Sequence, residues 1–138
     1  LSLKAAELED LRAFLRDYVS TFDELETLLF FLRAPREPWT ACEIATATGL
    51  DLDRAQLAIE ELMTVTCLLE RVSQSCKAQT FRFVPPANLE SVLIGLQRAY
   101  AEQRLRVVQI MSSNAMERVR ASAAQRMADV LRLERNKN

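Results

Sequence analysis

The chain of 138 residues carries a net charge of −1, and 49% of its residues are apolar, so it fits one domain with a modest core. Its two glycines and four prolines predict a mostly helical protein. The longest apolar run, residues 28–32, is too short to span a membrane, and we expect no leader segment from the composition of the first residues. We therefore expect a cytoplasmic protein without a membrane partner.

Histidine is absent, and the three cysteines, Cys42, Cys67 and Cys76, form no Cys-x-x-Cys pair. The chain therefore lacks the commonest acid–base side chain and any Ser-His or Cys-His nucleophile, and it has no Gly-rich phosphate loop. We expect no enzyme, no cofactor and no metal, with a three-thiolate site as the alternative. The spacing favours reduced thiols, with Cys42 and Cys67 buried. Cys76, exposed in a polar loop beside Lys77, should be the fastest to react.

Two helices are predicted before residue 35. The first covers residues 3–19 and carries an apolar stripe on one face: Leu8, Leu11, Phe14, Leu15 and Tyr18. Thr21 and Glu24 have the spacing of a capping box, so a second helix should begin there. This helix is apolar over more than half of its circumference, which predicts the central buried helix. Pro35 and Pro38 should end it, because a proline disfavours the helical conformation of the residue before it.

A helix, a tight turn and a second helix are predicted next. Thr40 and Glu43 form another capping-box pattern, and Gly49 can adopt the left-handed conformation that ends a helix. Asp51 or Asp53 can cap the helix that follows. The predicted inner face of that helix consists of small and apolar residues: Ala55, Ala58, Ile59, Leu62 and Met63.

Residues 68–72 and 80–84 read as two strands joined by a polar, exposed loop. The turn before the first strand is made by Thr66 and Cys67, without a glycine. Trp39 should lie in a short extended segment beside these strands. We expect it to pack on the core or on the strands rather than to hold a ligand.

The C-terminal part is predicted to be helical. Asn88 can cap a helix whose apolar stripe runs over residues 89–111, with an interruption at Gln103. Residues 112–114 read as a break or cap, followed by a final helix. This stripe is longer than a small domain can cover, so part of it should meet a partner chain. Residues 135–138 lack an apolar pattern and should fray.

The run Trp-Thr-x-x-Glu-Ile-Ala-x-x-x-Gly-Leu from Trp39 to Leu50, followed by Ala-Ile-Glu-Glu-Leu and Leu-Leu-Glu-Arg, resembles the winged helix-turn-helix of bacterial transcription regulators. The order of the helices is similar to that of MarR-type regulators. That resemblance implies a symmetric dimer of the outer helices with two winged domains facing DNA. The Asp-x-Arg triplet common in MarR-type wings is absent between Arg71 and Val84, so no ligand is implied.

The predicted fold class is therefore mainly α, a winged helix-turn-helix with flanking N- and C-terminal dimerisation helices. The single domain divides into an N-terminal helix (1–20), the winged helix-turn-helix (21–85), C-terminal helices (86–134) and a frayed tail (135–138). The expected dimer contacts are Leu8, Leu11, Tyr18, Leu93, Leu96, Tyr100 and Val107. Because Tyr100 is among them, Tyr100→Glu is expected to favour the monomer.

Charge bears on whether the domain binds DNA, because affinity comes largely from Lys and Arg on phosphates. Residues 41–85 carry four basic and six acidic side chains, and residues 86–138 carry nine and five. The C-terminal arginines read as a solvated helix face; a nucleic-acid surface, or pairing with the acidic first helix across a dimer, is the alternative.

Two functions compete. The fold favours a dimeric DNA-binding regulator; the acidic charge of the winged part favours a protein-interaction module that does not bind DNA. We favour the regulator, with double-stranded DNA and a second copy of the chain as partners. Its expected DNA contacts are Arg54, Gln56, Arg71, Lys77 and Arg82.

Overall fold

The computed structural model describes residues 4–34, 38–72 and 79–136. Its elements in chain order are α1 (Ala5–Tyr18), α2 (Phe22–Arg33), β1 (Trp39–Thr40), α3 (Ala41–Thr48), α4 (Leu52–Thr64), β2 (Leu69–Val72), β3 (Thr80–Phe83), the short 3-10 helix η1 (Ala87–Leu89), α5 (Glu90–Glu102) and α6 (Arg104–Asn136). The predicted fold class is confirmed as a mainly α chain with a small three-stranded antiparallel sheet. None of the helices in these ranges is long and apolar enough to cross a membrane.

Helices α2, α3 and α4 begin at capping residues that the sequence predicts, with Asp51 rather than Asp53 as the cap of α4. Thr40 and Glu43 form a complete capping box at α3, with both hydrogen bonds present. At α2 the Thr21 hydroxyl accepts from the Glu24 amide, but the Glu24 carboxylate accepts from the Ser20 amide instead of completing the box. The α4 cap is Asp51, whose carboxylate accepts from the Arg54 amide at 2.9 Å. Local sequence therefore determines where these three helices begin.

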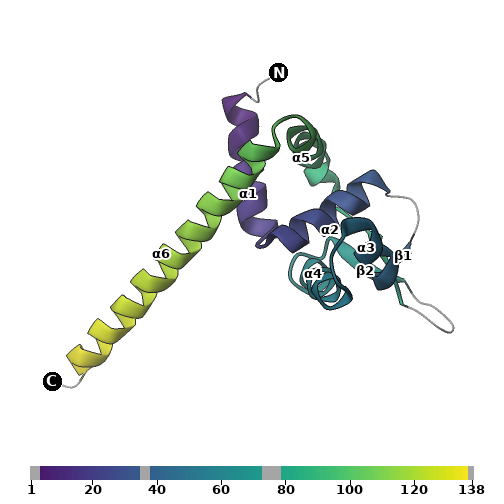
Figure 1. The fold of residues 1–138 in the computed structure, drawn as a ribbon. Helices are drawn as coiled ribbons and strands as arrows, with labels where there is room; N and C mark the ends of the chain where they lie inside the picture. The colour runs from purple at the N-terminus through teal and green to yellow at the C-terminus, as the bar shows by residue number, and fades with distance from the viewer. Residues whose placement is uncertain (1–3, 35–37, 73–78, 137–138) are drawn as a thin grey trace.

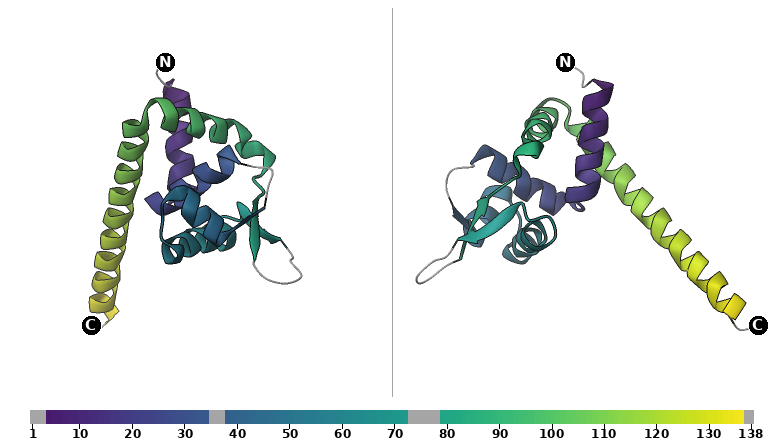
Figure 2. Two further views of the ribbon diagram at one scale, coloured as in Figure 1. Left: turned by 45° about the vertical axis from the view of Figure 1, so that its right-hand side comes forward. Right: turned by 180° about the vertical axis from the view of Figure 1, so that it is seen from behind.

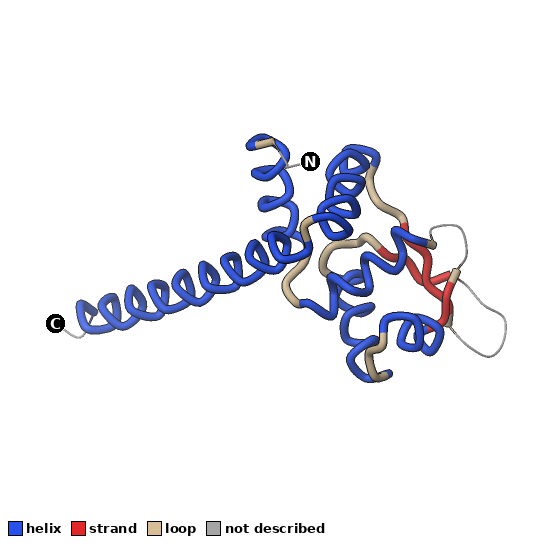
Figure 3. Tube along the Cα trace, turned by 45° about the horizontal axis from the view of Figure 1, so that its top comes forward, coloured by secondary structure: helices blue, strands red, loops and turns tan. Residues whose placement is uncertain are grey.

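The sheet has the strand order β1-β3-β2, and both pairs are antiparallel. Trp39 of β1 pairs with Phe81 of β3, which confirms a short extended segment beside the hairpin. The Trp39 indole donates to the Ala34 carbonyl at 3.1 Å, and its ring packs edge-on against Phe30 at 5.2 Å between centroids. Trp39 thus packs the end of α2 against the sheet, as expected for a packing residue. The strands appear in red in Figure 3.

The turn between α3 and α4 and the turn between α4 and β2 both require a left-handed residue. Gly49 supplies it in the first turn, with φ of 77°. In the second turn Cys67 takes φ of 57°, the one non-glycine residue with positive φ among the described positions. A side chain in this conformation costs about 1–2 kcal/mol, because Cβ approaches the following carbonyl oxygen.

The core is continuous from α1 to α6, and α2 is its central helix, as predicted. Leu25, Leu28, Leu29 and Phe31 of α2 are buried. In Figure 1, α2, α3, α4 and the sheet form one group, and α1, α5 and the start of α6 lie beside it. The C-terminal apolar stripe therefore packs largely inside the protomer: Leu93, Leu96, Ala99, Val107, Ile110 and Met111 are all buried.

The break in the C-terminal helices differs from the prediction. Gln103 ends α5, with φ of −137° and ψ of 53°, and α6 then runs without interruption through residues 112–114. Asn114 does not end the helix because it is buried against α1, where its amide donates to the Arg12 carbonyl at 3.3 Å. Asn88 does not cap α5, which follows directly on η1 and has no side-chain cap.

The distal half of α6 leaves the rest of the molecule. Arg118 is the last residue of α6 held to α1: its guanidinium donates to the Arg16 carbonyl at 2.9 Å. Residues 119–136 are all exposed, and the helix persists to Asn136, two residues into the segment predicted to fray. Both views in Figure 2 show this part of α6 as a projecting rod.

Candidate nucleic-acid interface

The helix α4 presents one face to the core and the other to solvent. Ala55, Ala58, Ile59 and Leu62 are buried, as the apolar spacing predicts, while Met63 is only partly buried. The outer face consists of acidic, amide and apolar side chains: Asp53, Gln56, Leu57, Glu60 and Glu61. If the domain binds DNA, this is the face of α4 that would enter the major groove.

A hollow of about 420 Å³ lies between α4, the start of α3 and the sheet. Its lining includes Gln56 of α4 and Arg71 of β2, with Ile59 and Phe81 as apolar members. The structure thus brings together Gln56 and Arg71, two of the five residues predicted to contact DNA. Arg71 forms no ion pair within the described part of the chain, so its charge is available.

Arg54 is held by a carboxylate from another helix. Its Nε lies 2.9 Å from Asp23 Oδ2 and its Nη2 lies 2.5 Å from Oδ1, a two-point contact with the first turn of α2. The hydrogen bond to Asp23, and then its charge, raise the pKa of Arg54 above its usual value. The guanidinium is charged in either case, so the effect of Asp23 is to neutralise and orient Arg54.

Arg82 is also paired. It lies directly opposite Glu70 in the β2–β3 register, and its Nε lies 3.0 Å from Glu70 Oε1. Both side chains are about half exposed, so the pair contributes little to stability but cancels the charge of this strand position. Lys77, the remaining predicted contact, lies outside the described residues. Of the basic residues predicted for the wing, Arg71 is therefore the only one in the described part that has no ion-pair partner.

Sequence reasoning missed the two carboxylates that hold these arginines. Glu70 could have been found: once strands 68–72 and 80–84 are predicted as a hairpin, their register places residue 70 opposite Arg82. Asp23 carried no such signal, because it lies 31 positions from Arg54 and on a different helix. Leu57, 68% exposed on the outer face of α4, was also not considered.

The residues predicted to form a dimer interface are found mainly in the core of one protomer. Leu11, Leu93, Leu96 and Val107 are at most 3% exposed, so they cannot by themselves offer a surface to a partner. Leu8, Tyr18 and Tyr100 are partly buried at the edges of the same core. The apolar periodicity identified a buried face correctly, but the face is covered by α1, α5 and α6 of the same chain.

Tyr100 joins α5 to α2. Its hydroxyl donates to Glu26 Oε1 at 2.6 Å, and the Arg104 guanidinium lies 5.0 Å from the ring centroid. Glutamate at this position would place a carboxylate beside Glu26. Tyr100→Glu would therefore disturb the fold of a single protomer, so it cannot serve as a clean test of dimerisation.

The cysteines differ from the prediction. Cys42 and Cys67 are both exposed rather than buried. Cys42 lies in the first turn of α3 at the rim of the hollow beside α4, and Cys67 lies in the left-handed turn. Cys76 lies outside the described residues. Because the thiols of Cys42 and Cys67 are accessible, we no longer expect Cys76 to be the only cysteine that reacts quickly with an alkylating reagent.

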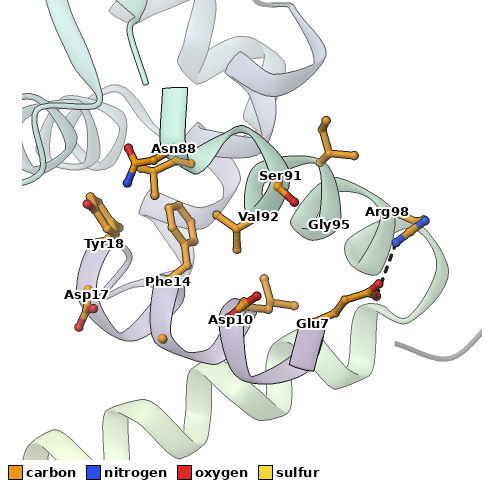
Figure 4. A pocket seen from close by; sticks show the side chains of 14 residues that line it. Glu7, Asp10, Phe14, Asp17, Tyr18, Asn88, Ser91, Val92, Gly95 and Arg98 are labelled. Carbon is orange, nitrogen blue, oxygen red and sulfur yellow. Dashed lines mark ion pairs between the residues drawn. The ribbon is translucent and has the colours of Figure 1, made fainter. Parts of the chain in front are cut away.

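A second pocket, of about 540 Å³, lies between α1 and α5 (Figure 4). Phe14 and Val92 contribute apolar surface, Asp10 lies on its α1 side, and Glu7 pairs with Arg98 across it at 3.7 Å. The polar groups lie on the exposed rim. This pocket is separate from the hollow that contains Gln56 and Arg71.

No protein-family model matches the chain, and no curated protein sequence is significantly similar to it. Among solved structures, the chain is similar to a possible transcriptional regulator from Methanosarcina mazei Go1, with 14% identity and a TM-score of 0.49. The match covers 73% of this chain and 85% of that protein. From a similarity this distant, neither a ligand nor a target DNA sequence can be inferred for this chain.

Proposed function

We propose that the protein is a homodimeric, cytoplasmic DNA-binding transcription regulator that uses α4 and the β2–β3 hairpin, in the manner of the winged helix-turn-helix regulators that its sequence resembles. The observation that carries the proposal is the exposed outer face of α4, beside a hollow that holds Gln56 and Arg71 together. An exposed helix flanked by a basic strand position matches the shape of a major groove and its phosphate edge.

Each polar residue has a distinct role in this proposal. Gln56 would read a base edge, since a glutamine amide can donate to and accept from adenine. Arg71 would contact a phosphate. Arg54 would exchange Asp23 for a phosphate, which costs little because the ion pair is exposed: the Arg54 side chain is 54% accessible. With so few cations, the binding of a dimer should release the counterions of only about four to eight DNA phosphates.

The second candidate is a winged protein-interaction module that does not bind DNA. The ion pairs of Arg54 and Arg82 favour it, as does Leu57, an apolar side chain 68% exposed at the centre of the presumed reading face. A partner protein would bury Leu57, whereas DNA offers it only thymine methyl groups. The regulator predicts that substitutions at these residues change the affinity for DNA, whereas the interaction module predicts no DNA binding by any variant.

The test is a fluorescence titration of a pool of random DNA duplexes at low and moderate salt. The wild type should bind, and its affinity should fall with added salt. Arg71→Ala should weaken binding and reduce the salt slope by about one contact. Asp23→Ala should strengthen binding, because it releases Arg54 and removes a negative charge beside it that would repel the phosphates. Arg98→Ala on α5, the same substitution far from the hollow, serves as the control and should change neither.

No binding at low salt would reject the regulator, because the electrostatic attraction is strongest there. Binding that is insensitive to Arg71→Ala and Asp23→Ala would place the DNA on another surface, and it too would contradict the proposal.

A further inference from the structure

The pocket between α1 and α5 has an apolar floor. Leu11, Phe14 and Leu89 are buried there, and Tyr18 and Val92 are partly buried beside them. Figure 4 shows Phe14 of α1 and Val92 of α5 pointing into the space between the two helices. Pockets that hold small organic molecules are mostly apolar, carry a few polar groups and have volumes like the 540 Å³ of this one. The space between α1 and α5 therefore has the size and the lining of a ligand site.

Gly95 leaves this space open on the side of α5. It lies in the interior of α5 and in the lining of the pocket, and it does not take the left-handed conformation that Gly49 adopts. A Cβ at Gly95 would meet no heavy atom within 4 Å beyond the backbone of its own helix, so close packing does not require glycine either. Glycine weakens the interior of a helix relative to alanine. Its effect at this position is a pocket wall without a side chain.

The charge that the pocket leaves unpaired is negative. Its described lining contains three carboxylates and one guanidinium: Glu7, Asp10, Asp17 and Arg98. Arg98 pairs with Glu7 at 3.7 Å, and Asp17 accepts from Arg16 Nε at 3.1 Å. Asp10 has no hydrogen bond or ion pair within the described part of the chain. A ligand would therefore meet an unpaired carboxylate, whereas the guanidinium is already engaged.

We propose that this pocket binds an organic monocation, in which an ammonium group is joined to an aromatic or aliphatic body. The ammonium group pairs with Asp10, and the body covers Phe14 and Val92, which removes apolar surface from water. The rings of Phe14 and Tyr18 stack at 5.0 Å between centroids, and they favour a cation over an anion because the face of an aromatic ring is negative. The site requires neither DNA binding nor a dimer, so it goes beyond the regulator proposed above.

A titration of the full chain, followed by proton–nitrogen correlation NMR, tests the proposal. Three probes share a naphthalene body and differ in charge: naphthylethylammonium, naphthylethanol and naphthylpropanoate. The chain has only two glycines, so the Gly95 amide signal is easily identified, and Gly49 at the end of α3 is an internal control. The ammonium probe should shift the Gly95 signal and leave that of Gly49 in place. It should bind about fivefold more tightly than the alcohol, and the propanoate should bind most weakly.

Two variants locate the site. Gly95→Leu places a side chain in the pocket and should weaken binding of the ammonium probe at least tenfold. Gln97→Leu adds the same side chain to an exposed position of α5 outside the described lining and should have no such effect. Asp10→Asn keeps the shape but removes the charge, so it should lower the affinity for the ammonium probe about fivefold and leave that for the alcohol unchanged. Asp53→Asn on α4 makes the same change away from the pocket, and the NMR spectra verify that each variant is folded.

Tighter binding of the propanoate than of the ammonium probe would overturn the proposal, because Arg98 would then select the ligand. Binding that survives Gly95→Leu, or a Gly95 signal that none of the probes shifts, would overturn it as well. Sedimentation of the wild type and of Gly95→Leu tests a second copy as the occupant. Association that Gly95→Leu abolishes, without binding of any probe, would show that the partner chain fills the pocket, and it would reject the ligand site.

The same titrations separate this site from the regulator. A chain that binds the ammonium probe but no DNA duplex would support the ligand site and reject the regulator. A chain that binds duplexes but none of the three probes would reject the ligand site alone.

Discussion

Cys67 lies at a backbone position that suits glycine better. Its φ of 57° is unfavourable for a residue with a Cβ, and its thiol is exposed, so the side chain offers no buried contact in return. Glycine would relieve about 1–2 kcal/mol of strain, while its greater freedom in the unfolded chain costs about 0.5–1 kcal/mol.

We therefore expect Cys67→Gly to raise the free energy of unfolding by up to about 1.5 kcal/mol, measured by urea denaturation. Cys67→Val should lower it by more than 1 kcal/mol, because a branched Cβ tolerates positive φ worst. Cys42→Gly is the matched control. It replaces an exposed cysteine in helical conformation and should destabilise by roughly 0.1–0.4 kcal/mol. Destabilisation by Cys67→Gly would mean that the thiol makes a contact that its exposure does not suggest.

At the scale of elements, the contact of α2 with α5 depends on a polar link beside the core. The Tyr100 hydroxyl donates to Glu26 at 2.6 Å. Burial, and then this hydrogen bond, raise the pKa of Tyr100 above its ordinary value of 10.0. Because the folded-state pKa is the higher one, the stabilisation is complete below about pH 10 and is lost as the pH rises through the folded-state pKa.

Tyr100→Phe should lower the free energy of unfolding by about 1–2 kcal/mol at neutral pH, because it removes a hydrogen bond to a charged acceptor. The ring and its contact with Arg104 are retained. The difference between wild type and variant should shrink as the pH rises above about 10, where the tyrosine ionises in the unfolded state. Urea denaturation at a series of pH values measures it. Tyr18→Phe provides a matched control, since Tyr18 has no hydrogen bond among those the structure describes. A difference that grows at high pH would contradict this assignment.

At the scale of the whole molecule, the body and the distal half of α6 should separate cleanly. The core ends at Asn114, and Arg118 still holds α6 to α1. A chain that ends after Ala121 keeps all of these contacts and loses most of the exposed apolar side chains of distal α6, among them Met127 and Val130. Because these apolar side chains are left uncovered in the protomer, we expect the shortened chain to fold and to be monomeric.

Thermal unfolding at several protein concentrations measures this difference. The unfolding midpoint of the full chain should rise with protein concentration, because association stabilises only the folded state, whereas the midpoint of the shortened chain should stay constant. A shortened chain whose midpoint also rises would show that the protomers associate through α1 or α5.

What the sequence determined by itself is local. The cap at Thr40, a cap at Asp51 or Asp53, the turn at Gly49 and the two strands depend on groups a few positions apart or on a repeating apolar pattern. Such features are complete within a short stretch of chain, so they can be predicted without knowing what lies next to it.

Only the tertiary structure decided which surfaces meet. Periodicity shows that a helix has an apolar face, but not whether its own chain or a partner covers it. Leu93 and Leu96 are covered within the protomer, whereas Met127 and Val130 are not. The pairing of Arg54 with Asp23 likewise depends on two helices brought together by the core, across 31 positions of sequence. Contacts between distant segments follow from how the whole core packs, so they cannot be predicted from the local sequence pattern of either segment.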